Sequence, residues 1–310
     1  MQFQHTSVLL NESIEALQIQ PDGIYVDGTL GGGGHSKEIL RKLKNGHLYA
    51  FDKDITAIET ATILLQEISD AFTIIHDDNC HLVKDLQEYQ VEQVDGILLD
   101  LGVSSHQFDC KERGFSYRFD ARLDMRMDQS QKALDAYEVI NHYSYERLTK
   151  IFYEYGEEPF SKVIAKNICD ERKKKPIETT LELVEIIKKS LPKAILSKKG
   201  HPAKKVFQAI RIEVNHELES LKKVIQDGLK ILKSKGRMVI ITFHSLEDRI
   251  VKQMFAQAIQ PEKSIKGLAS LKQATPQYRL VYKKPIVASK EELENNNRSH
   301  SAKLRVIEKI

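Results

Sequence analysis

Paired cysteines and long apolar runs are both missing from this sequence. Its three cysteines, Cys80, Cys110 and Cys169, lie far apart and form no C-x-x-C pair, which argues against a disulfide framework and a zinc site. No run of about eighteen apolar residues is present that could span a bilayer. The start of the chain, MQFQHTSVLLNESIEAL, lacks the basic and apolar segments of a signal peptide. We therefore expect a cytoplasmic protein with reduced cysteines and no membrane contact.

A large excess of charge of one sign is missing as well, because 47 basic residues balance 44 acidic ones to a net charge of +3. The basic residues nevertheless gather in the segments 170–176, 185–205 and 278–285. Such clusters can bind phosphates, although a lysine run is more often a solvated helix face. The charge pattern thus favours one local anion-binding surface over a general binder of polyanions.

Short β-branched and aromatic runs recur in the first hundred residues, at 23–28, 46–52, 72–77 and 94–102. Segments with apolar residues at helical spacing separate them, for example SKEILRKL and ITAIETATILLQEI. This β-α-β-α alternation predicts an α/β fold with a doubly wound, mostly parallel sheet. The apolar run ILL at 97–99 fits a strand that helices cover on both faces.

The alternation stops after residue 104, and about a hundred residues with helical patterns follow. We predict a helical insertion at 105–200 that recognises the substrate, and a sheet domain at 1–104 and 201–310. The segment 109–128 is rich in charge, methionine and aromatics but lacks periodicity, which suggests a long functional loop. Strands are expected again at 237–245 and in the last thirty or so residues.

Four consecutive glycines, Gly31 to Gly34, follow the first predicted strand. A glycine costs roughly 0.5–1 kcal/mol relative to alanine in regular structure, so this run needs a reason. The turn after a strand is the ligand crevice of an open α/β sheet. A strict G-x-G-x-x-G would require glycine at Ser36, so the dinucleotide fingerprint is incomplete, and a plain tight turn is the alternative.

Two aspartates at strand ends support a nucleoside ligand. Asp52 ends the second strand about 20 residues after the glycines, where a carboxylate can accept the hydroxyls of a ribose. Asp100 ends the fourth strand and precedes the small-residue loop LGVSS, which places it near the reacting end of such a ligand. These features do not separate a nicotinamide cofactor from S-adenosylmethionine, and each aspartate could instead have a structural role.

Several longer motifs together resemble the bacterial small-subunit ribosomal RNA cytosine-N4 methyltransferase family, type H. They are HTSVLLNESIEAL, DGTLGGGGHS, DGILLDLGVSS, ERGFSY, LDMRMD, YGEE, HPAKKVFQAIRIEVNHEL and FHSLEDR, and the resemblance runs from His5 to the final SAKLRVIE. It implies a class I, Rossmann-like methyltransferase with an antiparallel edge and a helical insertion domain. The implied cofactor is S-adenosyl-L-methionine. The implied substrate is the exocyclic amine of a cytidine in the decoding centre of 16S rRNA.

The resemblance also implies roles for individual residues. Gly33, Gly34 and His35 would contact the methionine part of the cofactor, Asp52 its ribose, Asn79 its adenine side, and Asp100 and Gln107 the groups near the methyl. This sequence has Asn79 where relatives tend to have an aromatic residue, and His106 where proline is usual.

Asp100 is the candidate catalytic residue, because it and nearby backbone carbonyls could accept the hydrogens of the cytosine amine. Phe108 or Phe115 could stack on the target base. The alternative is that Asp100 only positions the cofactor and that both phenylalanines are packing residues. His35 is expected in the cofactor loop and His244 as a structural residue at a strand end, and no residue spacing predicts a metal site.

RNA contact is assigned to the helical insertion and its rim. The predicted residues are Arg113, Arg118, Arg122, Arg126, Lys173, Lys174 and Lys175. The rival interpretations are a nicotinamide-dependent oxidoreductase, a methyltransferase acting on DNA or protein, and a non-catalytic assembly factor that binds a nucleoside and RNA. The sequence leaves open whether the substrate is naked RNA or the small ribosomal subunit, and whether the protein forms a homodimer.

Overall fold

The computed structural model describes residues 7–130, 133–261 and 276–310. The chain divides into two compact units, the first formed by Met1–Gly102 and Leu218–Ile310 and the second by Val103–Glu217. The helical unit therefore extends beyond the expected boundary at residue 200. It does so because helix α11 (Lys204–Asn215) packs against α7 (Tyr145–Glu154) and contributes residues to the same apolar core.

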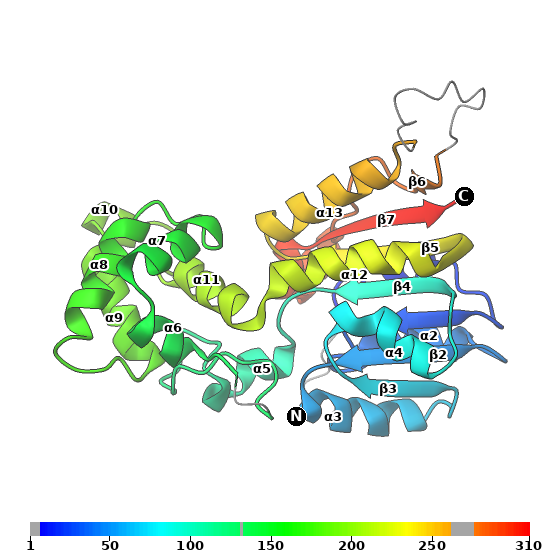
Figure 1. The fold of residues 1–310 in the computed structure, drawn as a ribbon, viewed down its shortest axis with the longest axis horizontal. Coiled ribbons are helices and arrows are strands. Elements are labelled where there is room, and N and C mark those ends of the chain that lie inside the picture. Colours follow the sequence, from blue (N-terminus) through cyan, green and yellow to red (C-terminus); the bar gives the residue numbers. More distant parts are fainter. Residues whose placement is uncertain (1–6, 131–132, 262–275) are drawn as a thin grey trace. The chain divides into compact units, whose positions relative to one another are not determined.

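The first unit is built on a seven-stranded sheet in the order β3-β2-β1-β4-β5-β7-β6 (Figure 1). The strands are β1 (Ile24–Asp27), β2 (His47–Asp52), β3 (Phe72–His76), β4 (Val94–Asp100), β5 (Leu232–Thr242), β6 (Tyr278–Leu280) and β7 (Lys303–Lys309). Strands β1 to β5 pair in parallel, whereas β7 runs antiparallel to both β5 and β6. The antiparallel strand thus lies one position in from the edge of the sheet, between β5 and β6.

Successive residues of a strand point to opposite faces of the sheet, so both faces carry side chains to be buried. Helices cover both faces of this sheet. One core packs α1 (Leu10–Leu17), α2 (Gly34–Lys42) and α3 (Ile55–Gln66) against residues such as Leu98 and Val239. The other packs α4 (Leu82–Glu88), α12 (Glu217–Ile231) and α13 (Ser245–Ala258) against residues such as Ile97 and Leu99. Since residues 97–99 are fully buried, the predicted covering of this strand on both faces is confirmed.

The remaining elements of the first unit are short: the 3-10 helix η1 (Asn79–His81), α14 (Lys290–Asn295) and the 3-10 helix η3 (Asn297–Ser301). Across the three described ranges, no helix has both the length and the apolar character needed to cross a membrane.

The second unit is helical, as predicted, and has a core of its own. Besides α7 and α11 it contains α5 (Ser105–Asp109), η2 (Lys111–Arg113), α6 (Ala136–His142), α8 (Ser161–Glu171), α9 (Thr180–Ser190) and α10 (Lys193–Leu196). The segment 114–130 has almost no regular structure, yet it is held in place. The side chain of Asn215 donates to the carbonyl of Met125 at 2.8 Å and accepts the N–H of Met127 at 2.8 Å.

Candidate functional site

The glycine run forms the turn between β1 and α2, and its members have different surroundings. Gly33 caps α2 with φ +78°, a left-handed conformation that disfavours other residues, and a Cβ there would lie 3.2 Å from Ala61. A Cβ on Gly34 would collide with the hydroxyl of Ser7. Gly32, in contrast, has no atom of the described residues within 4 Å of its Cβ position. Tight packing explains Gly33 and Gly34, whereas Gly32 borders open space that a ligand could enter.

Asp52 lies at the end of β2 and anchors this turn. One of its carboxylate oxygens accepts the N–H of Gly31 at 2.7 Å, and the other accepts the N–H of Asp54 at 2.9 Å. Burial raises the pKa of Asp52 to about 6, although these two hydrogen bonds oppose the shift. Each carboxylate oxygen keeps acceptor capacity, so the position is suited to binding vicinal hydroxyls.

Asp100 and His35 meet at the carboxyl end of β4, with His35 Nδ1 and Asp100 Oδ2 3.6 Å apart. Burial lowers the pKa of His35 to about 4, which makes the imidazole neutral at pH 7. Burial, Asp27 and Glu247 raise the pKa of Asp100 well above its ordinary value. Asp100 Oδ1 and His35 Nε2 are buried and have no hydrogen-bond partner among the described residues. Such atoms are costly unless a bound group satisfies them.

Asp27 is a further candidate site residue, which the sequence did not predict. It ends β1, is fully buried, and accepts the N–H of Thr29 at 3.0 Å and the hydroxyl of Ser36 at 2.7 Å. The hydroxyl of Thr29 in turn accepts the N–H of Asp100 at 2.6 Å. Asp27 therefore links the turn, α2 and the end of β4. The signal that could have revealed it is the one used for Asp52 and Asp100, a carboxylate on the last residue of a parallel strand.

Asn79 lies in the first unit and Gln107 in the second, and each side chain forms a hydrogen bond with the backbone of its own unit. Asn79 lies in η1 after β3, and its amide donates to the carbonyl of Gly28 at 2.8 Å. Gln107 is buried in the second unit, where its side-chain oxygen accepts the N–H of Ser104 at 3.1 Å. Asn79 thus lies in the first unit together with Gly33, Gly34, His35, Asp52 and Asp100. The roles of Asn79 and Gln107 toward a cofactor stay predictions.

His244 is a helix cap. It precedes α13, and its ring accepts the N–H of Glu247 while the carboxylate of Glu247 accepts the N–H of His244. This capping box gives it the structural position at a strand end that the sequence analysis expected.

Two of the predicted RNA contacts are wrong because their side chains are inside the helical unit. Phe115 is only 4% exposed and belongs to the apolar core, so it cannot stack on a base. Arg113 is 6% exposed, and its guanidinium donates to the carbonyls of Arg126 and Met127 at 3.0 and 2.8 Å. Arg113 therefore holds the irregular segment together. Phe108 is partly exposed.

The other predicted RNA contacts have accessible side chains. Arg118 is exposed, and Arg122 is 56% exposed while it pairs with Asp124 and Asp135. Arg126 is less accessible, because its side chain is 18% exposed and pairs with Asp124 at 2.7 Å.

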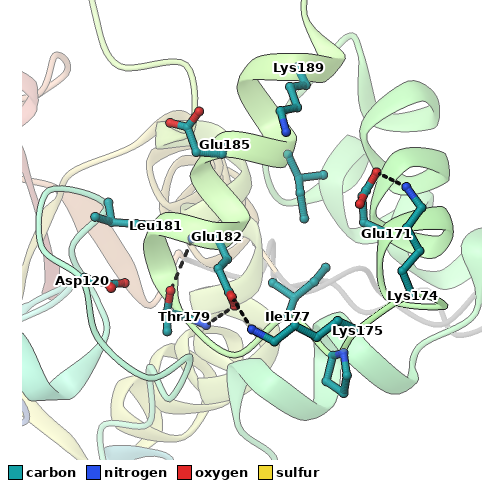
Figure 2. Close-up of a pocket in the computed structure, with 12 residues that line it drawn as sticks. Asp120, Glu171, Lys174, Lys175, Ile177, Thr179, Leu181, Glu182, Glu185 and Lys189 are labelled. Atoms are coloured by element: carbon teal, nitrogen blue, oxygen red, sulfur yellow. Dashed lines mark hydrogen bonds and ion pairs between the residues drawn. The ribbon is translucent and has the colours of Figure 1, made fainter.

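Lys173, Lys174 and Lys175 follow α8, are exposed, and pair with Asp170, Glu171 and Glu182. The last two lysines line an open hollow between the end of α8 and α9 (Figure 2). Carboxylates outnumber lysines along the hollow, which contains Asp120, Glu171, Glu182 and Glu185 besides Lys174, Lys175 and Lys189. Exposed ion pairs contribute about 1 kcal/mol or less, so these carboxylates hold the lysine side chains only weakly.

A doubly wound sheet with an antiparallel β7, a glycine turn after β1 and carboxylates at the ends of β1, β2 and β4 defines a class I methyltransferase domain. The chain belongs to the MraW methylase family, whose model matches residues 2–310. The resemblance seen in the sequence is thereby confirmed.

Individual relatives extend this finding. The chain is 51% identical over 316 aligned positions to "Ribosomal RNA small subunit methyltransferase H" of two strains of Lactobacillus delbrueckii subsp. bulgaricus. Each alignment covers 100% of this chain and 100% of the relative. Among solved structures it is similar to an rRNA methylase from Streptococcus thermophilus, with 12% identity and a TM-score of 0.42, over 97% of this chain and 93% of the other.

Proposed function

We propose that the protein transfers a methyl group from S-adenosylmethionine to the exocyclic N4 amine of a cytidine in the decoding centre of 16S rRNA. Methylation of small-subunit rRNA is supported by the family and by the full-length relatives of that name. The cytidine and its place in the decoding centre rest on the motif resemblance. The observation that carries the proposal is the buried, unpartnered carboxyl oxygen of Asp100 at the carboxyl end of β4.

The residues present fit this cofactor. S-adenosylmethionine supplies a methyl carbon that its sulfonium makes electrophilic, and it carries an ammonium group and a ribose. Asp100 provides a carboxyl oxygen without a partner, suited to a cation, and Asp52 can accept ribose hydroxyls. The open side of Gly32 lets a ligand approach the backbone of the turn.

Aligning the methyl donor with the amine is the main task of the chain, because the donor is already activated. The cytosine amine is a poor nucleophile, since its lone pair is delocalised into the ring. Asp100 and nearby backbone carbonyls accept the amine hydrogens, which favours a pyramidal nitrogen. The imidazole of His35 is neutral at pH 7. The reaction does not require it as a general base. The proton of the methylated amine passes readily to water.

RNA binding is assigned to the second unit. Arg118, Arg122 and Lys173 to Lys175 are exposed and suited to phosphates, and Phe108 is the remaining candidate for stacking on the target base. Localisation in the cytoplasm and a homodimer stay predictions.

The test is transfer of labelled methyl from S-adenosylmethionine to small ribosomal subunits from a strain that lacks this gene, with nucleoside analysis of the product. We expect N4-methylcytidine in 16S rRNA, and its loss with Asp100→Asn. Asp95→Asn is the matched control, because Asp95 lies at the other end of β4 and pairs with Lys233. Comparison of subunits with naked 16S rRNA identifies the true substrate. Binding of cofactor and subunits without any transfer would instead indicate the non-catalytic assembly factor.

A further inference from the structure

Two aromatic rings stack face to face at the surface of the helical unit. The rings of Tyr117 and His201 have centroids 4.2 Å apart and an interplanar angle of 11°. Both residues are partly exposed. They come from distant parts of the chain, the irregular segment after η2 and the loop before α11. The pair is therefore built by the tertiary fold and is not a local contact between sequence neighbours.

Tyr117 also contacts the core of the helical unit. Its ring meets that of Phe207 edge to face, with centroids 5.7 Å apart and an angle of 88°, and Phe207 is only 3% exposed. His201 is fixed by the backbone, because its Nδ1 accepts the N–H of Ala203 at 3.2 Å. Because Tyr117 covers one face of the imidazole, a third ring can stack only on the other face of His201, with Tyr117 behind it.

The His201 ring is suited to stacking in its neutral form. Burial, Lys188 and Arg118 lower the pKa of His201. The hydrogen bond from Ala203 requires an unprotonated Nδ1, which leaves the proton on Nε2. A flat, uncharged imidazole presents a π-face on which any nucleobase can stack.

The surroundings of the pair are basic. Arg118 follows Tyr117 directly and is exposed, and Lys198 and Lys199 are exposed in the loop that leads to His201. Lys188 lies close enough to affect His201, and it pairs with Glu185 at 2.8 Å on the exposed surface. An aromatic face with cations nearby is the combination with which proteins bind single-stranded nucleic acid.

We infer that His201, supported by Tyr117, is a stacking platform for an unpaired base of the RNA substrate, with Arg118, Lys198 and Lys199 binding the adjoining phosphates. This inference rests on RNA being the substrate, as proposed above. The platform differs from the predicted stacking residues Phe108 and Phe115.

The test pairs two variants that separate stacking from the structural role of the His201 ring nitrogen. His201→Phe keeps a ring but loses the acceptor for Ala203, whereas His201→Asn keeps an acceptor but loses the ring. With 16S rRNA as the probe, we expect His201→Phe to bind like the wild type and His201→Asn to bind at least about 5-fold more weakly. The slope of log affinity against log salt should stay the same, because no charge is removed. The reverse order of the two variants would overturn the inference.

Photocrosslinking gives a second readout. We expect 16S rRNA that contains 5-iodouridine to crosslink to His201 or Tyr117, and to lose that crosslink in His201→Asn. Tyr153, on α7 and 66% exposed, is the control, because among the described residues no ring pair includes it. Crosslinks at Tyr153 alone would contradict the platform. Absence of binding by the wild-type protein to both 16S rRNA and small ribosomal subunits would instead contradict the proposed function.

Discussion

The backbone N–H of Asp100 donates to the hydroxyl of Thr29 at 2.6 Å, so the last residue of β4 is tied to the turn that follows β1. Thr29 is itself positioned by the buried carboxylate of Asp27, which accepts its N–H. The side chain of Asp100 has no hydrogen-bond partner of its own on Oδ1 within the described ranges. Its position is therefore set through its backbone, and Thr29 is a positioning residue for the candidate catalytic carboxyl.

Thr29→Val should impair methyl transfer while Thr29→Ser should not. Valine keeps the shape of the threonine side chain but leaves the N–H of Asp100 without its acceptor. An unsatisfied donor of this kind raises the free energy of the folded state by about 1–3 kcal/mol. We expect kcat/KM to fall about tenfold in Thr29→Val and to stay near the wild-type value in Thr29→Ser. Thr180→Val is the control, because Thr180 is a buried threonine of the helical unit whose hydroxyl donates to the carbonyl of Phe119. Equal activity losses in Thr29→Val and Thr180→Val would indicate a general effect on stability.

The strand-end aspartates show which part of the site the sequence can predict. Asp52 and Asp100 were predicted because parallel strands end at one edge of the sheet, a rule that needs only the strand boundaries. The errors at Arg113 and Phe115 fall in a segment without periodicity, which distant partners such as Asn215 hold in place. No local pattern encodes such contacts. The end of the helical unit was missed for the same kind of reason, since α11 is amphipathic and its partner α7 lies far away in the sequence.

Gly32→Ala separates a ligand-binding turn from a merely tight one. No atom in the part of the chain that the structure describes lies near the Cβ position of Gly32, and Gly32 is not in the left-handed region. Alanine there should therefore leave the free energy of unfolding unchanged or raise it by up to about 1 kcal/mol. A methyl group there should weaken S-adenosylmethionine binding if the cofactor approaches this backbone. Gly33→Ala should instead destabilise the fold, because of its φ of +78°. Calorimetric titration and urea unfolding measure both effects. Unchanged cofactor affinity in Gly32→Ala would favour the plain turn.

His35 should make the stability of the protein depend on pH in the acid range. Its pKa is 6.5 in the unfolded chain and about 4 in the folded one, so the unfolded state binds a proton first as the pH falls. The stabilisation is present above pH 6.5 and is lost as the pH decreases toward 4, by an amount on the order of 3 kcal/mol.

His35→Gln removes the titrating group and keeps a polar side chain of similar reach. We expect the free energy of unfolding, measured in urea between pH 4 and 7, to change less with pH in this variant than in the wild type. The raised pKa values of Asp52 and Asp100 change the free energy of unfolding with pH in the opposite direction. Both aspartates are present in both proteins, so their contribution cancels to first order when the two pH curves are subtracted. Parallel pH curves for the two proteins would show that His35 does not titrate differently on folding.

Neutralising Lys173, Lys174 and Lys175 to glutamine should reduce the salt dependence of RNA binding. Each lysine that contacts a phosphate contributes about 0.9 to the slope of log affinity against log salt on duplex nucleic acid and about 0.7 on single strands. We therefore expect the slope to decrease by about 2–3. The ion pairs with Asp170, Glu171 and Glu182 are exposed, so their loss should leave stability within about 1 kcal/mol of the wild type. Lys223 and Lys230 are the control, because they are exposed and paired with Asp227 in the first unit. An equal change of slope in Lys223→Gln/Lys230→Gln would show that the response is a nonspecific effect of net charge. An unchanged slope in the triple variant would show that Lys173, Lys174 and Lys175 do not contact phosphates of the RNA.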